Sequence, residues 1–208
     1  MSNIEVYPLF SSPVGVIDIE KNLFDKQFIK SHFDYELCNS PGSVNSFATS
    51  ESLDVLNNNG QKNALLNYFN TYKNNFLKLH STNFQIVSAW FTKTLPGGYS
   101  QFHNHQNSVY SAVYYFDDYD DDSGKLEFES YGILPNQILL NNPTEWGPYN
   151  SRSWTYKPMS NKMVIFPSYL YHRVTENKSP LTRYSMALNF FPIGKFGVGD
   201  SNINLMVM

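Results

Sequence analysis

The pattern of apolar residues changes after Thr82, and this change most limits what the chain can fold into. Before that point, two segments place apolar side chains at helical spacing; beyond it, apolar and polar residues alternate with a period of two. The alternating segments are FQIVSAWFTKTL, SVYSAVYYF, GKLEFESYG, NKMVIFP and RYSMALNFFP. Strands that follow helices predict an antiparallel sandwich or barrel with helices packed against one face.

The first part of the chain supplies the helices. The segments EKNLFDKQFIKSHFDYEL and QKNALLNYFNTYKNNFLKL predict two helices, and LFSSPVGVIDI before them predicts an opening strand. The polar stretch GSVNSFATSESLDVLNNNG predicts a loop. Residues 96–98, Pro-Gly-Gly, predict a turn, and the polar segment 135–158 predicts a long insertion of the kind that often forms a lid or binding loop.

Composition fits one domain spanning residues 1–208, with helical support at about 20–80 and a β core at about 84–192. The 208 residues are 41% hydrophobic and 16% charged, with a net charge of -3 and no block of Lys and Arg, so nucleic acid is not an expected partner. Cys38 is the only cysteine, which excludes an internal disulfide. The first twenty residues do not resemble a signal peptide, and no apolar run approaches the ~18 residues of a membrane span, so we expect a cytoplasmic protein without membrane contact.

Three of the five histidines predict a metal site. His103 and His105 lie two residues apart before an alternating segment, so in an extended backbone they face the same way. His172 follows the apolar segment VIFP and is the obvious third ligand. Each histidine alone would be read as a surface or hydrogen-bonded residue, and His32 and His80 are read as solvated.

The last alternating segment carries a polar face. In RYSMALNF, Arg183, Ser185, Ala187 and Asn189 share one face, and bulky apolar residues share the other. Arg183 follows His172 by eleven residues. A guanidinium is a planar donor suited to a carboxylate, and the Ser185 hydroxyl can donate to the same group.

These motifs together resemble the iron(II)- and 2-oxoglutarate-dependent oxygenases. In that family an H-x-D/E motif precedes the core strands, a distal His follows an apolar strand, and a basic residue about ten positions later, often in R-x-S, binds 2-oxoglutarate. The nearer resemblance is to a phage and marine bacterial subgroup, related to prolyl 4-hydroxylase-like dioxygenases. It covers about residues 7–192 and rests on LFSSPVGV, HNHQNSVYSAVYYF, VIFPSYLYHRV and RYSMALNF.

The resemblance implies a double-stranded β-helix, or jelly roll, that uses Fe(II), 2-oxoglutarate and O₂ to hydroxylate a substrate with release of succinate and CO₂. It implies that Arg183 and Ser185 bind the C5 carboxylate of 2-oxoglutarate. Asn107 and Tyr115, on the odd-numbered face that continues from the histidine pair, and Asn189 beside Arg183, are further candidates for binding 2-oxoglutarate or substrate. A peptide or small-molecule substrate is expected rather than a nucleic acid.

One departure from the family concerns the metal ligands. The family commonly uses two His and one carboxylate, whereas this chain has His105 at the carboxylate position. Asp117 and Asp118 lie at the far end of the following strand, a poor position for a ligand beside His103. We therefore expect His103, His105 and His172 as the ligands; the alternative is that one of the pair does not bind metal.

Two other functions fit part of the pattern. Gly97, His103 and His105 match the G-x5-H-x-H start of a cupin motif, although the glutamate expected next is missing. A three-His cupin dioxygenase would need no 2-oxoglutarate and has no use for Arg183 and Ser185. A non-enzymatic binding protein on the same fold would purify without stoichiometric iron.

Overall fold

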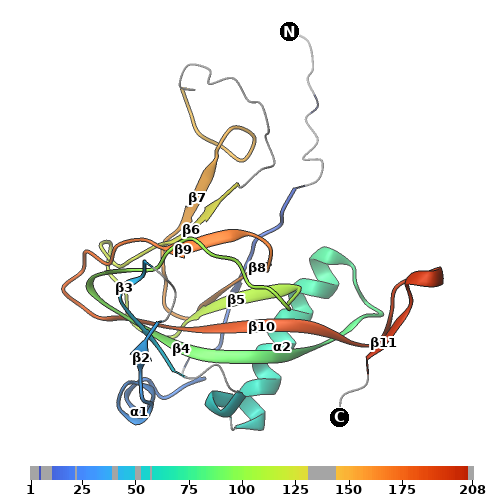
Figure 1. Cartoon of the computed structure of the whole chain (residues 1–208), viewed down its shortest axis with the longest axis horizontal. Helices are drawn as coiled ribbons and strands as arrows, with labels where there is room; N and C mark the ends of the chain where they lie inside the picture. Colours follow the sequence, from blue (N-terminus) through green and yellow to red (C-terminus); the bar gives the residue numbers. More distant parts are fainter. Residues whose placement is uncertain are drawn as a thin grey trace.

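Two antiparallel sheets face each other, and two helices cover the outer side of the larger sheet (Figure 1). The computed structural model describes residues 5, 11–21, 23–38, 42–49, 53–56, 58–130 and 144–205. Within these ranges, none of the helices combines the length and the apolar character needed to cross a lipid bilayer.

The large sheet is formed by strands from both halves of the chain. Its order is β1-β8-β5-β10-β4-β3-β2, with β11 added to the end of β10. The strands are β1 (Gly15–Asp18), β2 (Glu36–Leu37), β3 (Val44–Ala48), β4 (Asn83–Tyr99), β5 (Tyr110–Tyr115), β8 (Lys162–Pro167), β10 (Arg183–Phe196) and β11 (Ile203–Leu205).

The small sheet has the order β7-β6-β9 and lies above the large sheet in Figure 1. Its strands are β6 (Leu126–Glu129), β7 (Ser153–Tyr156) and β9 (Tyr171–Val174). The helical elements are α1 (Lys26–His32), α2 (Asn59–Tyr72) and the single π-helical turn η2 (Lys73–Leu77) that continues α2, with the short 3₁₀ turns η1 (Leu53–Leu56) and η3 (Gly199–Ser201).

The main hydrophobic core lies between the helices and the outer face of the large sheet. Leu65 and Phe69 of α2 are fully buried there, and the Phe69 ring stacks on Phe190 of β10 at a centroid distance of 4.1 Å. Asn58 starts α2 because its side chain accepts a hydrogen bond from the Gly60 amide. Helix packing therefore fixes the large sheet from outside and leaves its other face to the small sheet.

The predicted β protein with N-terminal helices is confirmed, and all five alternating segments form strands: β4, β5, β6, β8 and β10. The predicted loop after Gly42 is wrong at Val44–Ala48, which forms β3 because pairing with β4 outweighs its polar composition. The predicted Pro-Gly-Gly turn is also wrong. Residues 96–98 lie inside β4, where Gly97 adopts a φ of +74° that glycine tolerates.

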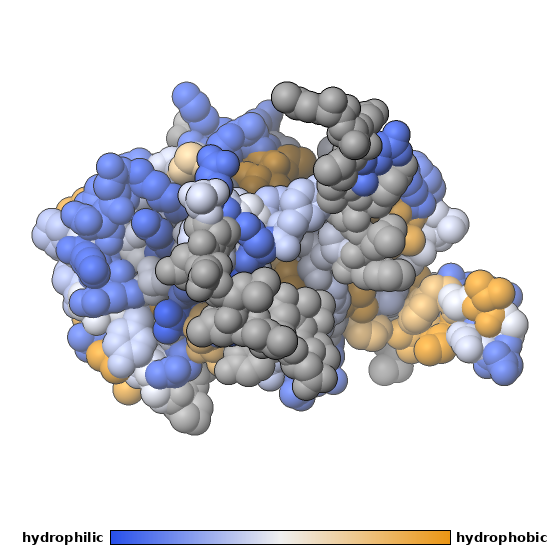
Figure 2. Space-filling view, turned by 90° about the horizontal axis from the view of Figure 1, so that it is seen from above, coloured by the Kyte–Doolittle hydropathy of each residue, from blue (hydrophilic) through white to orange (hydrophobic). Residues whose placement is uncertain are grey.

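The predicted insertion at 135–158 is only partly described, because its residues up to 143 lie outside the described ranges. Its last part is not a loop: Ser153–Tyr156 form β7, an edge strand that pairs with β6. At the other end of the molecule, the β10–β11 hairpin projects from the large sheet, and Figure 2 shows hydrophobic residues gathered on it. Its exposed apolar residues are Val198, Ile203 and Leu205.

Candidate metal and co-substrate site

Three histidines meet between the two sheets. His103 and His172 form an isolated antiparallel bridge, in which each backbone N–H donates to the carbonyl oxygen of the other at 3.0 and 2.9 Å. His105 lies beside them, and its backbone N–H donates to the Ser168 carbonyl oxygen. One ligand atom from each imidazole lies within 4.8 Å of the other two, so some point lies within about 2.8 Å of all three, near the ~2.0–2.1 Å of a metal–His bond.

Backbone hydrogen bonds orient two of these rings. Nδ1 of His103 lies 2.8 Å from the Gln101 carbonyl oxygen, and Nδ1 of His172 lies 2.8 Å from the Leu170 carbonyl oxygen. A carbonyl oxygen only accepts, so each Nδ1 carries the proton and each Nε2 keeps its lone pair. This arrangement fixes the tautomer that a metal ion needs at Nε2.

Burial keeps the imidazoles of His105 and His172 uncharged. Desolvation, reinforced by His103, lowers the pKa of His105 to about 4. Desolvation also lowers the pKa of His172, and His103 and His105 add to this effect. Neutral imidazoles have the free lone pairs required for metal binding at neutral pH.

No carboxylate joins this cluster within the part of the chain that the structure describes. Asp117 forms an ion pair with Lys30 of α1, and Asp118 forms one with Lys26. Both acids are therefore engaged with the helical side of the large sheet. The cluster is a set of three imidazole nitrogen donors, a combination that suits Fe, Zn, Cu or Ni.

Arg183 lies in the same cavity, at the start of β10. Its side chain is 2% exposed, Nε donates to the Gly124 carbonyl oxygen at 3.0 Å, and Nη1 donates to Ser185 Oγ at 3.0 Å. Nη2 is buried and has no hydrogen-bond partner in the described structure. No ion pair within the described residues involves Arg183, so the guanidinium is a buried cation without a paired carboxylate there.

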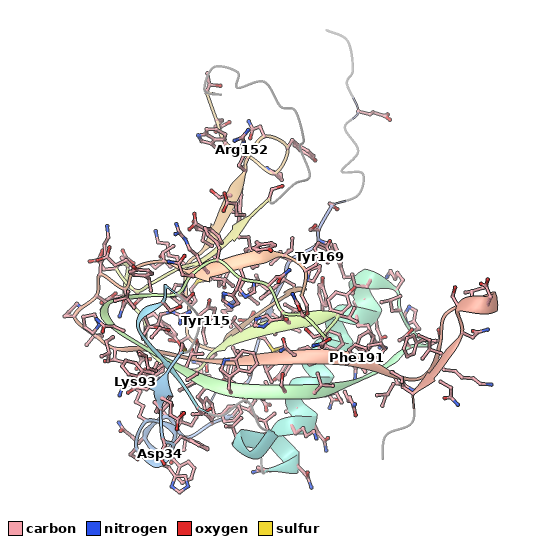
Figure 3. The ribbon with its side chains drawn as sticks, in the orientation of Figure 1. Asp34, Lys93, Tyr115, Arg152, Tyr169 and Phe191 are labelled. Carbon is pink, nitrogen blue, oxygen red and sulfur yellow. The ribbon has the colours of Figure 1, made fainter. Side chains whose placement is uncertain are left out.

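Tyr115 of β5 lies beside the guanidinium. Its ring centroid is 5.3 Å from the Arg183 guanidinium carbon, and its side chain lies between the two sheets (Figure 3). The buried hydroxyl forms no hydrogen bond of good geometry among the described residues, and burial raises its pKa, while the charge and the hydrogen-bonding contact of Arg183 oppose that rise. Arg183 Nη2 and the Tyr115 hydroxyl therefore lie side by side, and neither has a well-formed hydrogen bond within the described residues.

The structure places the other two candidates, Asn107 and Asn189, away from this cavity. The chain turns at Gln106–Asn107, so the odd-numbered face does not run on from His105; Asn107 has a φ of +61° and lines a second cavity of about 490 Å³. Asn189 accepts from Ser111 Oγ at 2.7 Å and donates to Ser88 Oγ at 3.0 Å. These bonds tie β10 to β5 and β4.

The cavity holding the three histidines and Arg183 has a volume of about 640 Å³. Its floor is the inner face of the large sheet, where residues paired across neighbouring strands point the same way. One such row runs Ser185–Thr92–Ala48–Glu36 from β10 to β2, and the next runs Arg183–Thr94–Ser46 from β10 to β3.

The outer part of this floor was not predicted from the sequence. Thr92 and Thr94 follow the visible alternation of β4 and could have been found from it. Glu36 and Ser46 could not, because their segments were taken for the end of a helix and for a loop. Only pairing between strands brings them to the cavity.

A family model with the description "Putative 2OG-Fe(II) oxygenase" matches residues 88–189. This chain belongs to the 2OG-Fe(II) oxygenases. The matched part of the oxygenase includes the three histidines, Arg183 and Ser185. A search of curated proteins finds no match.

Solved structures show the same fold. A 2OG-Fe(II) family oxidoreductase from Burkholderia pseudomallei is 9% identical, with a TM-score of 0.55 over 85% of this chain and 83% of that one. A Pseudomonas putida prolyl-4-hydroxylase is 13% identical, with a TM-score of 0.53 over 88% and 94%. HygX from Streptomyces hygroscopicus, solved with nickel, 2-oxoglutarate and hygromycin B, is 11% identical, with a TM-score of 0.55 over 87% and 83%. These likenesses confirm the predicted jelly roll for this oxygenase.

Proposed function

We propose that this oxygenase binds Fe(II) through His103, His105 and His172 and binds 2-oxoglutarate through Arg183, with Ser185 and Tyr115 beside it. It would hydroxylate a peptide or small molecule and release succinate and CO₂. The observation that carries this assignment is the presence, in one cavity, of a three-His cluster and a buried arginine that forms no ion pair within the described residues.

The side chains present fit both groups. Nε2 of His103, Nε2 of His172 and a ring nitrogen of His105 are suitable ligands for ferrous iron, and none of the ion pairs in the described ranges involves these histidines. A carboxylate beside Arg183 would supply the missing partner of Nη2 and neutralise the buried charge. The Tyr115 hydroxyl is positioned to donate to the same carboxylate.

Bound iron with 2-oxoglutarate and O₂ supplies the oxidising equivalent for hydroxylating a C–H bond. The protein's own residues position and shield this chemistry. Hydrogen bonds from Nδ1 hold His103 and His172 in one tautomer, and Phe166 packs against the His172 ring at 4.7 Å. Ser185 holds the Arg183 guanidinium through Nη1, and Thr92 shares a 2.7 Å hydrogen bond with the Ser185 hydroxyl. These contacts keep the guanidinium in place before the co-substrate binds.

The test is an anaerobic titration followed by exposure to oxygen. Protein reconstituted with Fe(II) should bind one iron per chain, and added 2-oxoglutarate should produce the visible charge-transfer band of an iron-bound 2-oxoacid. Oxygen should then yield succinate. One iron per chain without an effect of 2-oxoglutarate would favour the cupin-type alternative, and no iron at all would favour a binding protein.

A further inference from the structure

The cavity extends well beyond the part that Arg183 and Ser185 line. The row Ser185–Thr92–Ala48–Glu36 crosses four neighbouring strands, so its ends lie about 14 Å apart at ~4.8 Å per strand. Arg183 and Ser185 occupy the β10 end. The β4–β3–β2 part of the floor is left for the molecule that is oxidised.

Most of the polar residues that line this outer part of the cavity carry hydroxyl groups, and they lie among apolar neighbours such as Leu37 and Ala48. Its polar lining residues include Ser43, Ser46, Thr49, Thr92 and Ser100. Trp90 forms the boundary with the metal ligands, since its ring meets that of His105 at a centroid distance of 5.6 Å. A lining of this kind suits a polar substrate that lies between the histidines and the edge strand β2.

Glu36 gives this region its charge. It is the single carboxylate among the described residues that line the cavity, it is exposed, and none of the ion pairs in the described ranges involves it. Lys93, the basic residue within β2, β3 and β4, does not compensate it. Lys93 is paired with Phe47 and therefore lies in the row on the opposite face, where its ammonium contacts the rings of Tyr35 and Phe47.

The two charges are placed at opposite ends of one cavity. Arg183 is buried at the closed end, where the co-substrate carboxylate would neutralise it, and Glu36 stands at the open end over β2. A substrate that reaches from the histidines to β2 would therefore meet a negative charge at its distal end. Trp90 of β4 and Glu36 of β2 are separated by two strand spacings and by two residues along the strand, about 12 Å between their Cα atoms.

We propose that the substrate carries a positively charged amino or guanidinium group that pairs with Glu36, at the opposite end of the cavity from Arg183. This inference rests on the proposed function, because it takes the histidine cluster as the reaction centre. The cation belongs either to a free amine or to a lysine or arginine side chain of a protein, and both sources present the same chemistry to Glu36.

Two matched pairs of probes test this proposal. The first pair is 6-amino-1-hexanol and 1,6-hexanediol, which differ in one ammonium group. The second is a blocked Gly-Gly-Lys-Gly-Gly peptide and the same peptide with norleucine in place of lysine. Binding is measured at low ionic strength by calorimetry on metal-free protein and, separately, by the change in the charge-transfer band of anaerobic protein loaded with Fe(II) and 2-oxoglutarate.

In the wild-type protein at least one charged probe should bind about tenfold more tightly than its uncharged counterpart. Glu36→Gln should reduce this preference to less than twofold while 2-oxoglutarate binds as before. Asp34→Asn is the matched control, because Asp34 is an exposed acid beside α1 that does not line the cavity (Figure 3), and it should keep the preference. Preference in the first pair alone identifies a free amine, and preference in the second alone identifies a basic side chain.

Equal binding of charged and uncharged probes by the wild type, or a preference that survives Glu36→Gln, would overturn the proposal. Its failure is distinct from failure of the proposed function. If no charge-transfer band develops with Fe(II) and 2-oxoglutarate, the oxygenase assignment to this site fails, while calorimetry on the metal-free protein still reports on Glu36.

Discussion

The two faces of β10 are equally buried and chemically opposite. On the outer face Met186 and Leu188 are fully buried against the helices; on the inner face Arg183 and Ser185 are each 2% exposed. The outer residues make apolar contacts that are complete in the protein itself. The inner face retains an unpaired guanidinium nitrogen, so its interactions are completed only by another molecule. Burial alone therefore does not distinguish a core from a site; satisfaction of polar groups does.

The largest expected effect is on metal binding, at the histidine cluster that faces the inner side of the large sheet. His172→Ala removes the ligand common to every arrangement of the site, so we expect binding of Fe(II) to be lost, while the circular dichroism spectrum stays unchanged. Metal content after anaerobic reconstitution measures this. His80→Ala, at an exposed histidine outside the cavity, is the control and should bind one iron per chain. If the His172 variant still binds one iron per chain, the proposed three-His site is excluded.

On the outer face the expected effect is on stability. Leu188→Ala leaves a cavity in the main core and should lower the free energy of unfolding by about 2–5 kcal/mol, measured by urea denaturation. Binding of Fe(II) and 2-oxoglutarate to the folded variant should be unchanged. Leu181→Ala, at a 56% exposed position, should have little effect on stability. A loss of co-substrate affinity in Leu188→Ala would mean that the two faces are not independent.

Arg183→Leu replaces the buried guanidinium on the inner face of β10 with an apolar side chain like those on the outer face. Iron binding should persist, and the affinity for 2-oxoglutarate should weaken by roughly 2–5 kcal/mol, because its C5 carboxylate would be buried without a partner. The charge-transfer band followed during anaerobic titration gives the dissociation constant. Arg152→Leu, near the end of β7 and far from the cavity (Figure 3), is the matched control. An unchanged dissociation constant would exclude Arg183 as the anchor.

Ser185→Ala should have the smallest effect. It removes the hydroxyl that accepts from Arg183 Nη1, and the affinity for 2-oxoglutarate should fall by about 1 kcal/mol, close to fivefold. The same titration measures it. Ser31→Ala, which deletes an exposed hydroxyl on α1, should leave the affinity unchanged. A loss as large as that of Arg183→Leu would show that Ser185 contacts the co-substrate directly and does not only position the arginine.

The sequence predicted the fold where local pattern and tertiary structure agree. Alternation was sufficient to identify β4, β5, β6, β8 and β10, because each has one face on an apolar core. It failed for β2, β3, β7, β9 and β11, which lie at or next to sheet edges. Their conformation depends on neighbouring strands rather than on their own composition.

The same distinction applies to the site. His103, His105, His172 and Arg183 were identified from spacing because they belong to strands or to segments that adjoin them, and the structure brings all four to one cavity. Asn107 was misplaced because a turn at Gln106–Asn107 interrupts the alternation. Such a turn changes which face a residue joins, and the sequence carries no period from which to predict it.

The His103–His172 bridge has a consequence for folding. The two residues are 69 positions apart in the chain, and their reciprocal backbone hydrogen bonds close that loop in the folded state. An ion bound by both imidazoles would therefore cross-link distant parts of the chain. In the native state the loop between residues 103 and 172 is already closed, so binding costs no further loop entropy, whereas the unfolded chain would have to close that loop to bind the ion. Mass action then stabilises the folded protein by about 2.7 kcal/mol when free metal is at one hundred times its dissociation constant. The histidines that are proposed to support oxidation would also join β9 of the small sheet to the segment between β4 and β5.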